Sequence, residues 1–459
     1  MRKHRRNPLT ESCFIPQKDS KKGVRVTRQR YENYSHDLAY CAILDCFKSK
    51  WRRNDILTFI EEWTGISRLE IWQGELEGSP KIKYEVADQL AYVMDDVMEG
   101  IMRGENPDLD AVKIRTVPDG MTGKIRNIAY LCIMHQLLGH IVKLGLEPFF
   151  RARILPTQHA SLPKHGQTQL ALQVRRYLRK GKLKIKCFQK TDCTGAYASL
   201  QYAVLTDLFR REIPSATWII KTMEFLATCA PGGHLIIGGY LDAWLFNLAM
   251  SYGIRAVYTQ GRTRRGKFHR YVERIETFMD DFALLAQTAT GIKRAVAYLT
   301  VWMKENLKMQ VRTTTDIIYW LSPGEENAHR TRDRPAQRGC PGLDMGGYRI
   351  YRTHMTMRRR VAKRVIRTFL RAWREYERTG TLPRQRARSL ISRNGPVKFT
   401  YSRGFRKKYH VDELFKVAKR ITAYWGRVRT RKRKEHLIYV LQKCSVWREA
   451  VQGAAGAFA

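Results

Sequence analysis

The chain has 459 residues, with 84 Lys and Arg against 42 Asp and Glu, which gives a formal net charge of +42 at pH 7. With 44% hydrophobic residues it can form a sizeable core, so the composition excludes a disordered basic protein. A pI near 10.2 favours a polyanionic partner, with nucleic acid ahead of an anionic membrane surface.

Cysteines and apolar stretches exclude two further classes. The nine cysteines are scattered and form no CxxC pair, which argues against a disulfide framework or zinc module and for a reducing compartment. No apolar stretch follows the basic N-terminus, as a signal peptide requires. The longest apolar stretch, 235–250, is interrupted by Asp242 and two glycines and is too short for a membrane span. We therefore expect a cytoplasmic protein with no membrane partner.

The N-terminal part divides into an arm, a helical region and a hairpin. Residues 1–31 hold ten Lys and Arg against two Asp and Glu, which indicates a basic flexible arm. Apolar residues recur at helical spacing over 32–110, which predicts a helical N-terminal region. The sequence VKIRTVP–DGMTG–KIRNIAY, which begins at Val112, predicts a β-hairpin. Helices then follow up to about residue 180.

The central and C-terminal parts differ sharply in charge. A strand ends at Asp192, a glycine-rich loop precedes an apolar helix near Gly238, and a second strand pair carries FMDDF. Residues 351–459 hold 30 Lys and Arg against 6 Asp and Glu, a net charge of +24. We expect this region to be helical, with one face buried and one basic face that tracks a phosphate backbone.

Three aspartates lie in or beside apolar strands. Asp280 and Asp281 are adjacent within FMDDF, and Asp192 ends the strand CFQKTD. Adjacent carboxylates repel each other and lose hydration, and a divalent cation such as Mg²⁺ or Mn²⁺ compensates both costs. The alternative is structural, because an Asp pair is common in turns and a lone Asp commonly caps a helix.

The order of these motifs resembles the palm of reverse transcriptases. TDCTGAYASL resembles the first palm motif and FMDDF the aromatic-x-Asp-Asp box, while IGGYLDAWLFNL resembles the intervening glycine motif. LDMGGYRIY resembles the primer grip, and TGKIRNI the fingers hairpin. The set looks most like the bacterial enzymes of diversity-generating retroelements and their unassigned or defence-associated relatives.

The resemblance implies an α+β, right-hand polymerase fold with an antiparallel palm sheet and a helical thumb. Its parts are fingers at 111–186, a palm at 187–342, and a basic thumb and C-terminal RNA/DNA-binding region at 343–459. The implied activity is RNA-directed DNA synthesis from dNTPs on a primer 3′-hydroxyl, with two Mg²⁺ or Mn²⁺ ions. The implied partners are an RNA template, which can be a dedicated non-coding RNA, a DNA primer, and an accessory protein or further copies of the chain.

Roles of single residues follow from the same resemblance. Asp192, Asp280 and Asp281 are the catalytic metal ligands, with the backbone carbonyl of Cys193 as an extra ligand. The residues expected to bind the dNTP are Lys124, Arg126, Tyr197, Gly238 and Gly239. Lys308 is the candidate general acid, preferred over Arg312 because Arg is a poor proton donor. The residues expected to bind nucleic acid in the thumb are Arg358, Arg359, Arg360, Lys363, Arg364 and Arg367.

Several alternatives stay open at the level of sequence. Tyr197 is either a gate that excludes a 2′-hydroxyl or a core tyrosine, and the basic hairpin is either a triphosphate site or merely solvated. Asn247 is either a functional polar group or a satisfied buried amide. The family's Ser-Gln is replaced by Asp242 and Ala243, which leaves two functions: an active polymerase, or an inert RNA-binding protein derived from one.

Overall fold

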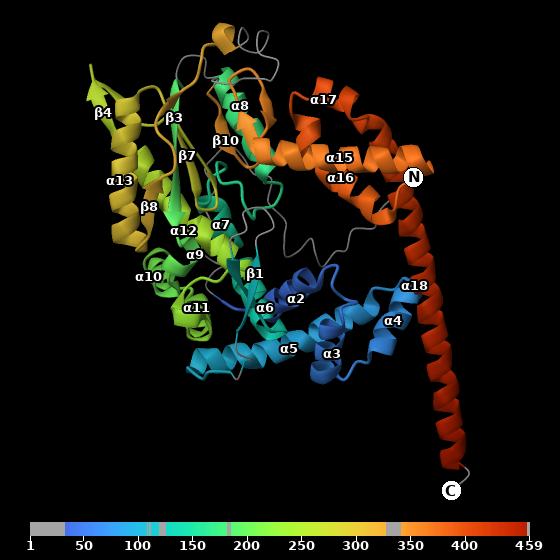
Figure 1. Cartoon of the computed structure of the whole chain (residues 1–459). Helices are drawn as coiled ribbons and strands as arrows, with labels where there is room; N and C mark the ends of the chain where they lie inside the picture. The colour runs from blue at the N-terminus through green and yellow to red at the C-terminus, as the bar shows by residue number, and fades with distance from the viewer. Residues whose placement is uncertain are drawn as a thin grey trace. The chain divides into compact units, whose positions relative to one another are not determined.

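A computed structural model describes residues 33–107, 109, 112–118, 125–180, 185–326 and 341–456. The chain forms two compact units, each assembled from segments that are distant in sequence (Figure 1). The first unit comprises Met1–Ile154, Tyr197–Ala249 and Arg433–Ala459, and the second comprises Leu155–Ala196 and Met250–Lys432. Both contain helices and strands, so the chain is of mixed class. The predicted palm range, 187–342, is divided between the two units.

The first unit is mainly helical. Its helices are α2 (His36–Phe47), α3 (Asn54–Thr64), α4 (Arg68–Glu77), α5 (Lys81–Arg103), α6 (Ile133–Gly145), α7 (Glu147–Arg153), α10 (Tyr202–Glu212), α11 (Thr217–Cys229) and the 3₁₀ turn η2 (Pro231–Gly233). Serines begin two of them: the Ser35 hydroxyl accepts the Leu38 N–H, and Ser67 forms a reciprocal capping box with Glu70. The helices predicted over 32–110 are therefore confirmed.

A β-hairpin connects α5 to α6. Strands β1 (Lys113–Pro118) and β2 (Ile125–Tyr130) pair antiparallel, with Lys113 opposite Tyr130. The hairpin that the sequence predicts is thus confirmed, whereas its connecting residues 119–124, and with them Lys124, lie outside the described residues. The arm predicted at 1–31 lies outside them as well.

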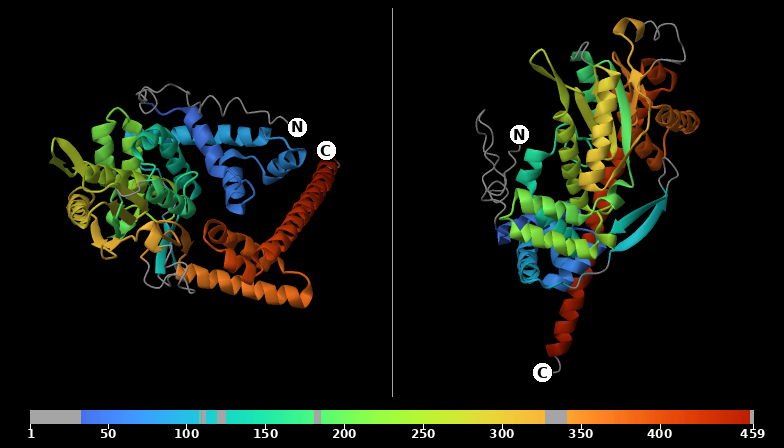
Figure 2. Two further views of the ribbon diagram at one scale, coloured as in Figure 1. Left: turned by 90° about the horizontal axis from the view of Figure 1, so that it is seen from above. Right: turned by 90° about the vertical axis from the view of Figure 1, so that its left-hand side faces the viewer.

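The second unit is built on an antiparallel sheet with strand order β6-β7-β3-β8, in which β9 also pairs with β3. Its strands are β3 (Cys187–Thr194), β6 (Arg274–Phe278), β7 (Asp281–Ala286), β8 (Gln310–Thr313) and β9 (Ile318–Tyr319). Helix α13 (Ala289–Leu307) packs on this sheet (Figures 1 and 2). Helix α8 (Gln167–Lys180) contributes Leu170 and Val174 to a core that includes Phe188 and Leu285.

Two smaller sheets complete the strands of the second unit. One is the ribbon of β4 (Gly261–Arg264) and β5 (Lys267–Arg270). The other comprises β10 (Leu343–Met345), β11 (Tyr348–Ile350) and β12 (Met355–Met357). The turn predicted within LDMGGYRIY connects β10 to β11. The basic C-terminal region thus begins with strands, and its helices start only at Arg359.

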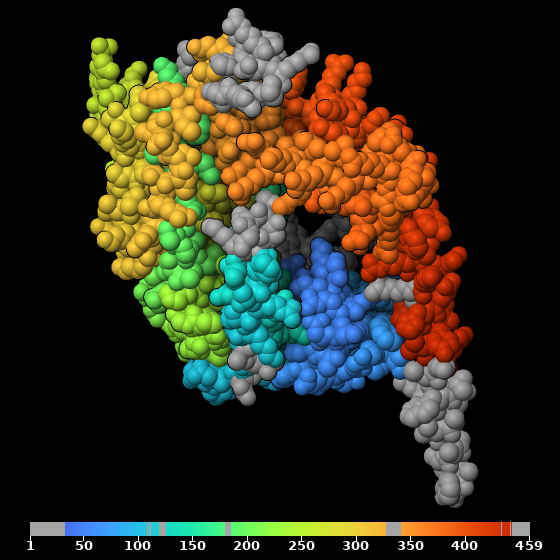
Figure 3. Space-filling model, in the orientation of Figure 1, coloured from blue at the N-terminus to red at the C-terminus, as the bar shows by residue number. Residues whose placement is uncertain are grey.

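The remaining C-terminal chain is helical. Helices α15 (Arg359–Thr379), α16 (Arg384–Phe399) and α17 (Arg403–Lys408) precede the long α18 (Val411–Gly456), while α9 (Ala196–Ser199) and α12 (Tyr240–Tyr258) lie earlier in the chain. Phe369, Leu390 and Leu414 meet in a core that α15, α16 and α18 share. Figure 3 shows the surface of these helices in orange and red. No helix in the described part of the chain is both long and apolar enough to span a membrane.

Candidate active site

The three aspartates lie together at one end of the five-stranded sheet. Asp192 is paired in register with Asp281 on one neighbouring strand and with Arg312 on the other. Directly opposed residues of antiparallel strands point to the same face, so these three side chains form a row across β7, β3 and β8. Asp280 belongs to the two-residue turn between β6 and β7, and its carbonyl accepts the Cys193 N–H at 3.2 Å. The expected convergence of the three acids is found.

The turn that presents Asp280 has an unusual backbone. Phe278 and Asp281 pair across it, so only Met279 and Asp280 connect the two strands. Met279 has a φ of 55°, in the left-handed region that a residue with a Cβ adopts only at a cost. Such strain persists where the surrounding structure fixes the position of a side chain. Here it holds Asp280 at the end of β3.

The carboxyl groups of Asp192 and Asp280 lie close enough for their charges to interact. Burial, followed by the nearby charge of Asp192, raises the pKa of Asp280 from 3.8 to about 6. Each of the other two aspartates has a cation. Arg312 donates to one oxygen of Asp192 from Nη2 at 2.8 Å, and Lys190 Nζ lies 3.3 Å from Asp281 Oδ1. These cations offset the repulsion within the row of acids.

The donor set partly fits a divalent cation. Carboxylate oxygens are the ligands that Mg²⁺ and Mn²⁺ prefer, and a cation would relieve the repulsion between Asp192 and Asp280. Within the part of the chain that the structure describes, however, no three His, Cys, Asp or Glu side chains are grouped closely enough to hold a metal ion. The three carboxylates would have to approach one another more closely to form such a set.

Two further residues assigned to this site are Cys193, which is in strand β3, and Lys308, which is directed to a backbone carbonyl. Cys193 is 2% exposed, and burial raises the pKa of its thiol to about 12, so the side chain is an inert apolar group and only its backbone is available as a ligand. Lys308 ends α13 with a φ of 56°, and its Nζ donates to the Glu305 carbonyl at 3.1 Å. The cation that contacts Asp192 is Arg312, whereas the Lys308 side chain is directed to a backbone carbonyl.

The first unit holds the other residues assigned to dNTP binding. The ring of Tyr197 stacks on Phe246 of α12, with centroids 4.9 Å apart and an angle of 10° between the planes. The ring is half-buried, so it is neither a core tyrosine nor fully free. Arg126 is exposed on β2, opposite Val117. Lys124 lies outside the described residues.

Gly238 and Gly239 have structural reasons to be glycine. A Cβ on Gly238, where φ is 117°, would lie 2.7 Å from the Ala129 carbonyl oxygen, and a Cβ on Gly239 would meet the carboxylate of Asp242. The adjacent Ile237 carbonyl accepts the Ala129 N–H at 2.7 Å. The backbone at these glycines therefore packs closely against strand β2.

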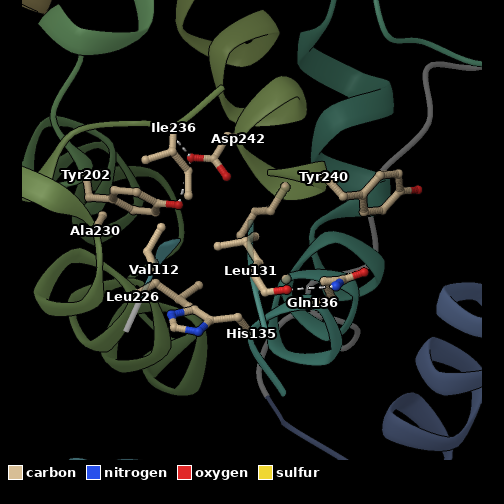
Figure 4. A pocket seen from close by; sticks show the side chains of 12 residues that line it. Val112, Leu131, His135, Gln136, Tyr202, Leu226, Ala230, Ile236, Tyr240 and Asp242 are labelled. Carbon is tan, nitrogen blue, oxygen red and sulfur yellow. Dashed lines mark hydrogen bonds between the residues drawn. The ribbon is translucent and has the colours of Figure 1, made fainter. Parts of the chain in front are cut away.

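Asp242 points into the protein beside a small cavity (Figure 4). One of its oxygens accepts the Tyr202 hydroxyl at 3.0 Å and the Ile236 N–H at 2.8 Å. The cavity of about 20 Å³ also contacts His135, and it has room for about one water molecule. Burial raises the pKa of Asp242 to about 6. Asp242 therefore anchors the glycine loop.

Asn247 donates from its side-chain amide to the Ala243 carbonyl at 2.8 Å and is 1% exposed. It is thus a satisfied buried amide, the second of the two alternatives.

The basic residues assigned to nucleic-acid binding begin helix α15. All but one of the six are exposed, and Arg364 is half-buried. Arg358 also lies 3.9 Å from Asp344. Further exposed cations continue at helical spacing along the same helix: Arg371, Arg374 and Arg378. One side of α15 is therefore a continuous basic stripe, whereas Val365 and Phe369 are buried.

Sequence reasoning missed a buried charged network behind the acids. Glu276 and His159 are both 0% exposed, and His159 Nε2 lies 2.7 Å from Glu276 Oε2. Arg274 donates to the other Glu276 oxygen at 2.8 Å and lies over the Tyr177 ring. The sequence does contain a signal for this network: Glu276 is two residues before FMDDF, and strand alternation puts its side chain on the same face of the sheet as Asp281.

Solved structures that resemble this chain include two telomerases. No model of a protein family matches the sequence, and neither does any curated protein. A telomerase from Candida albicans, in complex with a TWJ fragment of telomeric RNA, is 10% identical with a TM-score of 0.37, over 68% of this chain and 61% of that one. An apo telomerase from Candida tropicalis, truncated from its C-terminal domain, is 10% identical with a TM-score of 0.38, over 76% of this chain and 86% of that one. At these TM-scores the likeness carries no conclusion about fold or function.

Proposed function

We propose that the chain is an RNA-directed DNA polymerase. The observation that carries the proposal is the grouping of three acids: Asp192 lies opposite Asp281, and a strained turn holds Asp280 next to Cys193, near the charge of Asp192. Neighbouring carboxylates repel one another, which lowers the stability of the fold, and a purely structural role gives no reason to keep all three. The ordered reverse-transcriptase motifs around them specify the reaction.

Each residue of the site has a task in this proposal. Asp192, Asp280 and, after release from Lys190, Asp281 would hold Mg²⁺ or Mn²⁺ together with the Cys193 carbonyl. Bound there, the ions would supply activation of the primer 3′-hydroxyl and neutralisation of the leaving pyrophosphate. Arg312, next to Asp192, is placed to bind a phosphate oxygen by its guanidinium fork.

The residues of the first unit would handle the nucleotide. Arg126, with Lys124, would bind its triphosphate, and Tyr197 would exclude a 2′-hydroxyl by contact with the sugar. Stacking on Phe246 supports this role, because it fixes the orientation of the Tyr197 ring. The basic stripe of α15 would bind the phosphate backbone of the template–primer duplex.

One observation favours a second candidate, an inert RNA-binding protein. Two of the three acids are already neutralised by Arg312 and Lys190. If those pairs are permanent, the carboxylates are structural and the function would rest on basic surfaces such as the stripe of α15.

Primer extension on poly(rA)/oligo(dT) with Mg²⁺ or Mn²⁺ tests the proposal. Wild type is compared with Asp280→Ala/Asp281→Ala and with Asp316→Ala, a matched control because Asp316 is an exposed acid of the same unit. We expect extension by wild type and the control only, with equal binding of RNA by all three. Binding without extension by wild type would favour the inert protein. A place in a bacterial retroelement or anti-phage defence system stays a prediction, and sequencing of co-purifying nucleic acid tests it.

A further inference from the structure

The β4–β5 ribbon is a basic element that the proposed reaction does not use. It spans Gly261–Arg270, with the sequence GRTRRGKFHR, and contains five Lys and Arg and no acid. All but its first residue are exposed. The ribbon stands out from α13 and the five-stranded sheet (Figure 1).

The register of the ribbon places three of its five Lys and Arg, together with His269, on one face. Arg262 pairs with His269, and Arg264 pairs with Lys267. Because cross-strand partners and alternate residues share a face, these four side chains project from the same side of the ribbon. Among the residues that the structure describes, none of the four has an acidic partner.

Like charges placed directly opposite each other destabilise a two-stranded ribbon, which is marginal by itself. The turn imposes the pairing nevertheless. Arg265 and Gly266 have φ values of 50° and 71°, and positive φ at both central residues is the geometry of the tightest hairpin loop. The fold therefore maintains a repulsive cationic face, and a bound polyanion would remove that repulsion.

The other face and the base of the ribbon show how it is held. Phe268 lies over Gly261, where a Cβ would come within 2.5 Å of its ring. Arg270 lies over the Tyr258 ring, 5.4 Å from its centroid. Phe268 and Arg270 are thus on the face opposite Arg262, Arg264, Lys267 and His269, and the tip is Arg265–Gly266. A membrane-inserting hairpin has its apolar residues at the tip, so the arrangement favours a nucleic-acid backbone over a lipid surface.

The ribbon is also at the wrong end of β6 to serve the reacting atoms. The chain leaves it at Arg270 and enters β6 at Arg274, whereas Asp280 follows the other end of that strand. Five residues of strand span about 17 Å. A strand of nucleic acid on the ribbon is therefore not the segment being copied.

We propose that the cationic face of the β4–β5 ribbon binds the phosphate backbone of RNA outside the catalytic site. The choice of RNA rests on the proposed function, and the surface itself rests on the register and the charges. A-form RNA has a major groove too narrow for a ribbon to enter, so the contact is to phosphates and is independent of sequence.

Binding of a fluorescein-labelled 20-base-pair RNA stem-loop to the full chain tests this proposal, by fluorescence anisotropy in EDTA without dNTPs. The variant Arg264→Ala/Lys267→Ala is compared with Arg211→Ala/Lys304→Ala, which removes two exposed cations elsewhere. We expect the ribbon variant to lose about tenfold or more in affinity, and the slope of log K against log salt to fall by about 2. The control should change less than threefold. Phe268→Ala, on the other face, should behave like the control.

Equal losses in the two double variants would overturn the proposal, as would no loss in either. Loss of binding to phosphatidylserine vesicles, with RNA binding intact, would assign the ribbon to a membrane and also overturn it. A DNA stem-loop that binds better than the RNA would overturn the choice of RNA. Because the assay contains neither metal nor dNTP, a chain that fails in primer extension can still pass this test, so the two proposals fail separately.

Discussion

Replacing Asp280 with Asn should stabilise the metal-free protein while it abolishes synthesis. The pKa of Asp280 is raised from 3.8 to about 6 by burial and by Asp192, so its charged form is disfavoured in the folded state. Each step of one in pKa corresponds to about 1.4 kcal/mol, which makes the penalty up to about 3 kcal/mol above pH 6. Asn keeps the shape and removes the charge.

The sign of the pH dependence follows from the direction of the shift. A carboxyl group whose folded pKa is raised lowers stability as the pH increases from about 4 to about 6, and the loss persists above that range. Below pH 4 wild type and Asp280→Asn should therefore unfold at the same temperature. At pH 7.5 the variant should melt about 5–10 °C higher, given the usual scaling for a unit of this size.

Thermal unfolding in EDTA, followed by intrinsic fluorescence from pH 4 to 8, measures both effects. Addition of Mg²⁺ or Mn²⁺ should raise the melting temperature of wild type at pH 7.5 and leave Asp280→Asn nearly unchanged. The control Asp316→Asn, in an exposed loop, should follow wild type throughout. If Asp280→Asn melts at or below the wild-type temperature at pH 7.5, the carboxyl group makes stabilising contacts and the reasoning from repulsion is wrong.

Three further predictions concern residues of the first unit, and the first of them has a control in helix α18 of the second unit. Gly145→Ala would place a Cβ 2.6 Å from the buried Trp218 ring, so it should lower the free energy of unfolding by about 1–2 kcal/mol in a denaturant titration. Gly426 has open space around it, so Gly426→Ala should stabilise the protein slightly. Burial raises the pKa of Asp242 to about 6, so Asp242→Asn should reduce the loss of stability that occurs between pH 4 and 6. An unchanged dependence of stability on pH would show that Asp242 does not contribute to this loss. Tyr197→Val should increase incorporation of ribonucleotides relative to deoxyribonucleotides in primer extension, and an unchanged ratio would return the ring to a packing role.

Local patterns in the sequence predicted the elements that carry the chemistry. The alternation around FMDDF specifies two strands and a tight turn, and Asp192 ends a strand of the same sheet, so their convergence follows from antiparallel pairing. The β1–β2 hairpin was predictable for the same reason. Both features depend on residues that are close in sequence or that share one sheet.

Side-chain partners set by packing could not be predicted in this way. Lys308 and Arg312 are four residues apart but have different partners. Lys308 is at the left-handed end of α13 and donates to the Glu305 carbonyl. Arg312 is opposite Asp192 because of the register of β8. The inward direction of Asp242 likewise depends on Tyr202, forty residues earlier. Neither contact has a signal in local periodicity.

The net charge of +42 and the row of acids should respond differently to salt. Charges farther apart than about 8–10 Å are largely screened at physiological ionic strength, so the distant basic surface has little influence on Asp280. Burial and the contact with Asp192 act at short range and are screened much less. Raising KCl from 50 to 200 mM should therefore weaken RNA binding by about 10³-fold or more if six or more phosphates are contacted. Over the same range, the difference in melting temperature between wild type and Asp280→Asn should stay constant. A difference that grows with salt would mean that the basic surface stabilises the charged form of Asp280 over a long range, and the site could then be regulated by any bound polyanion.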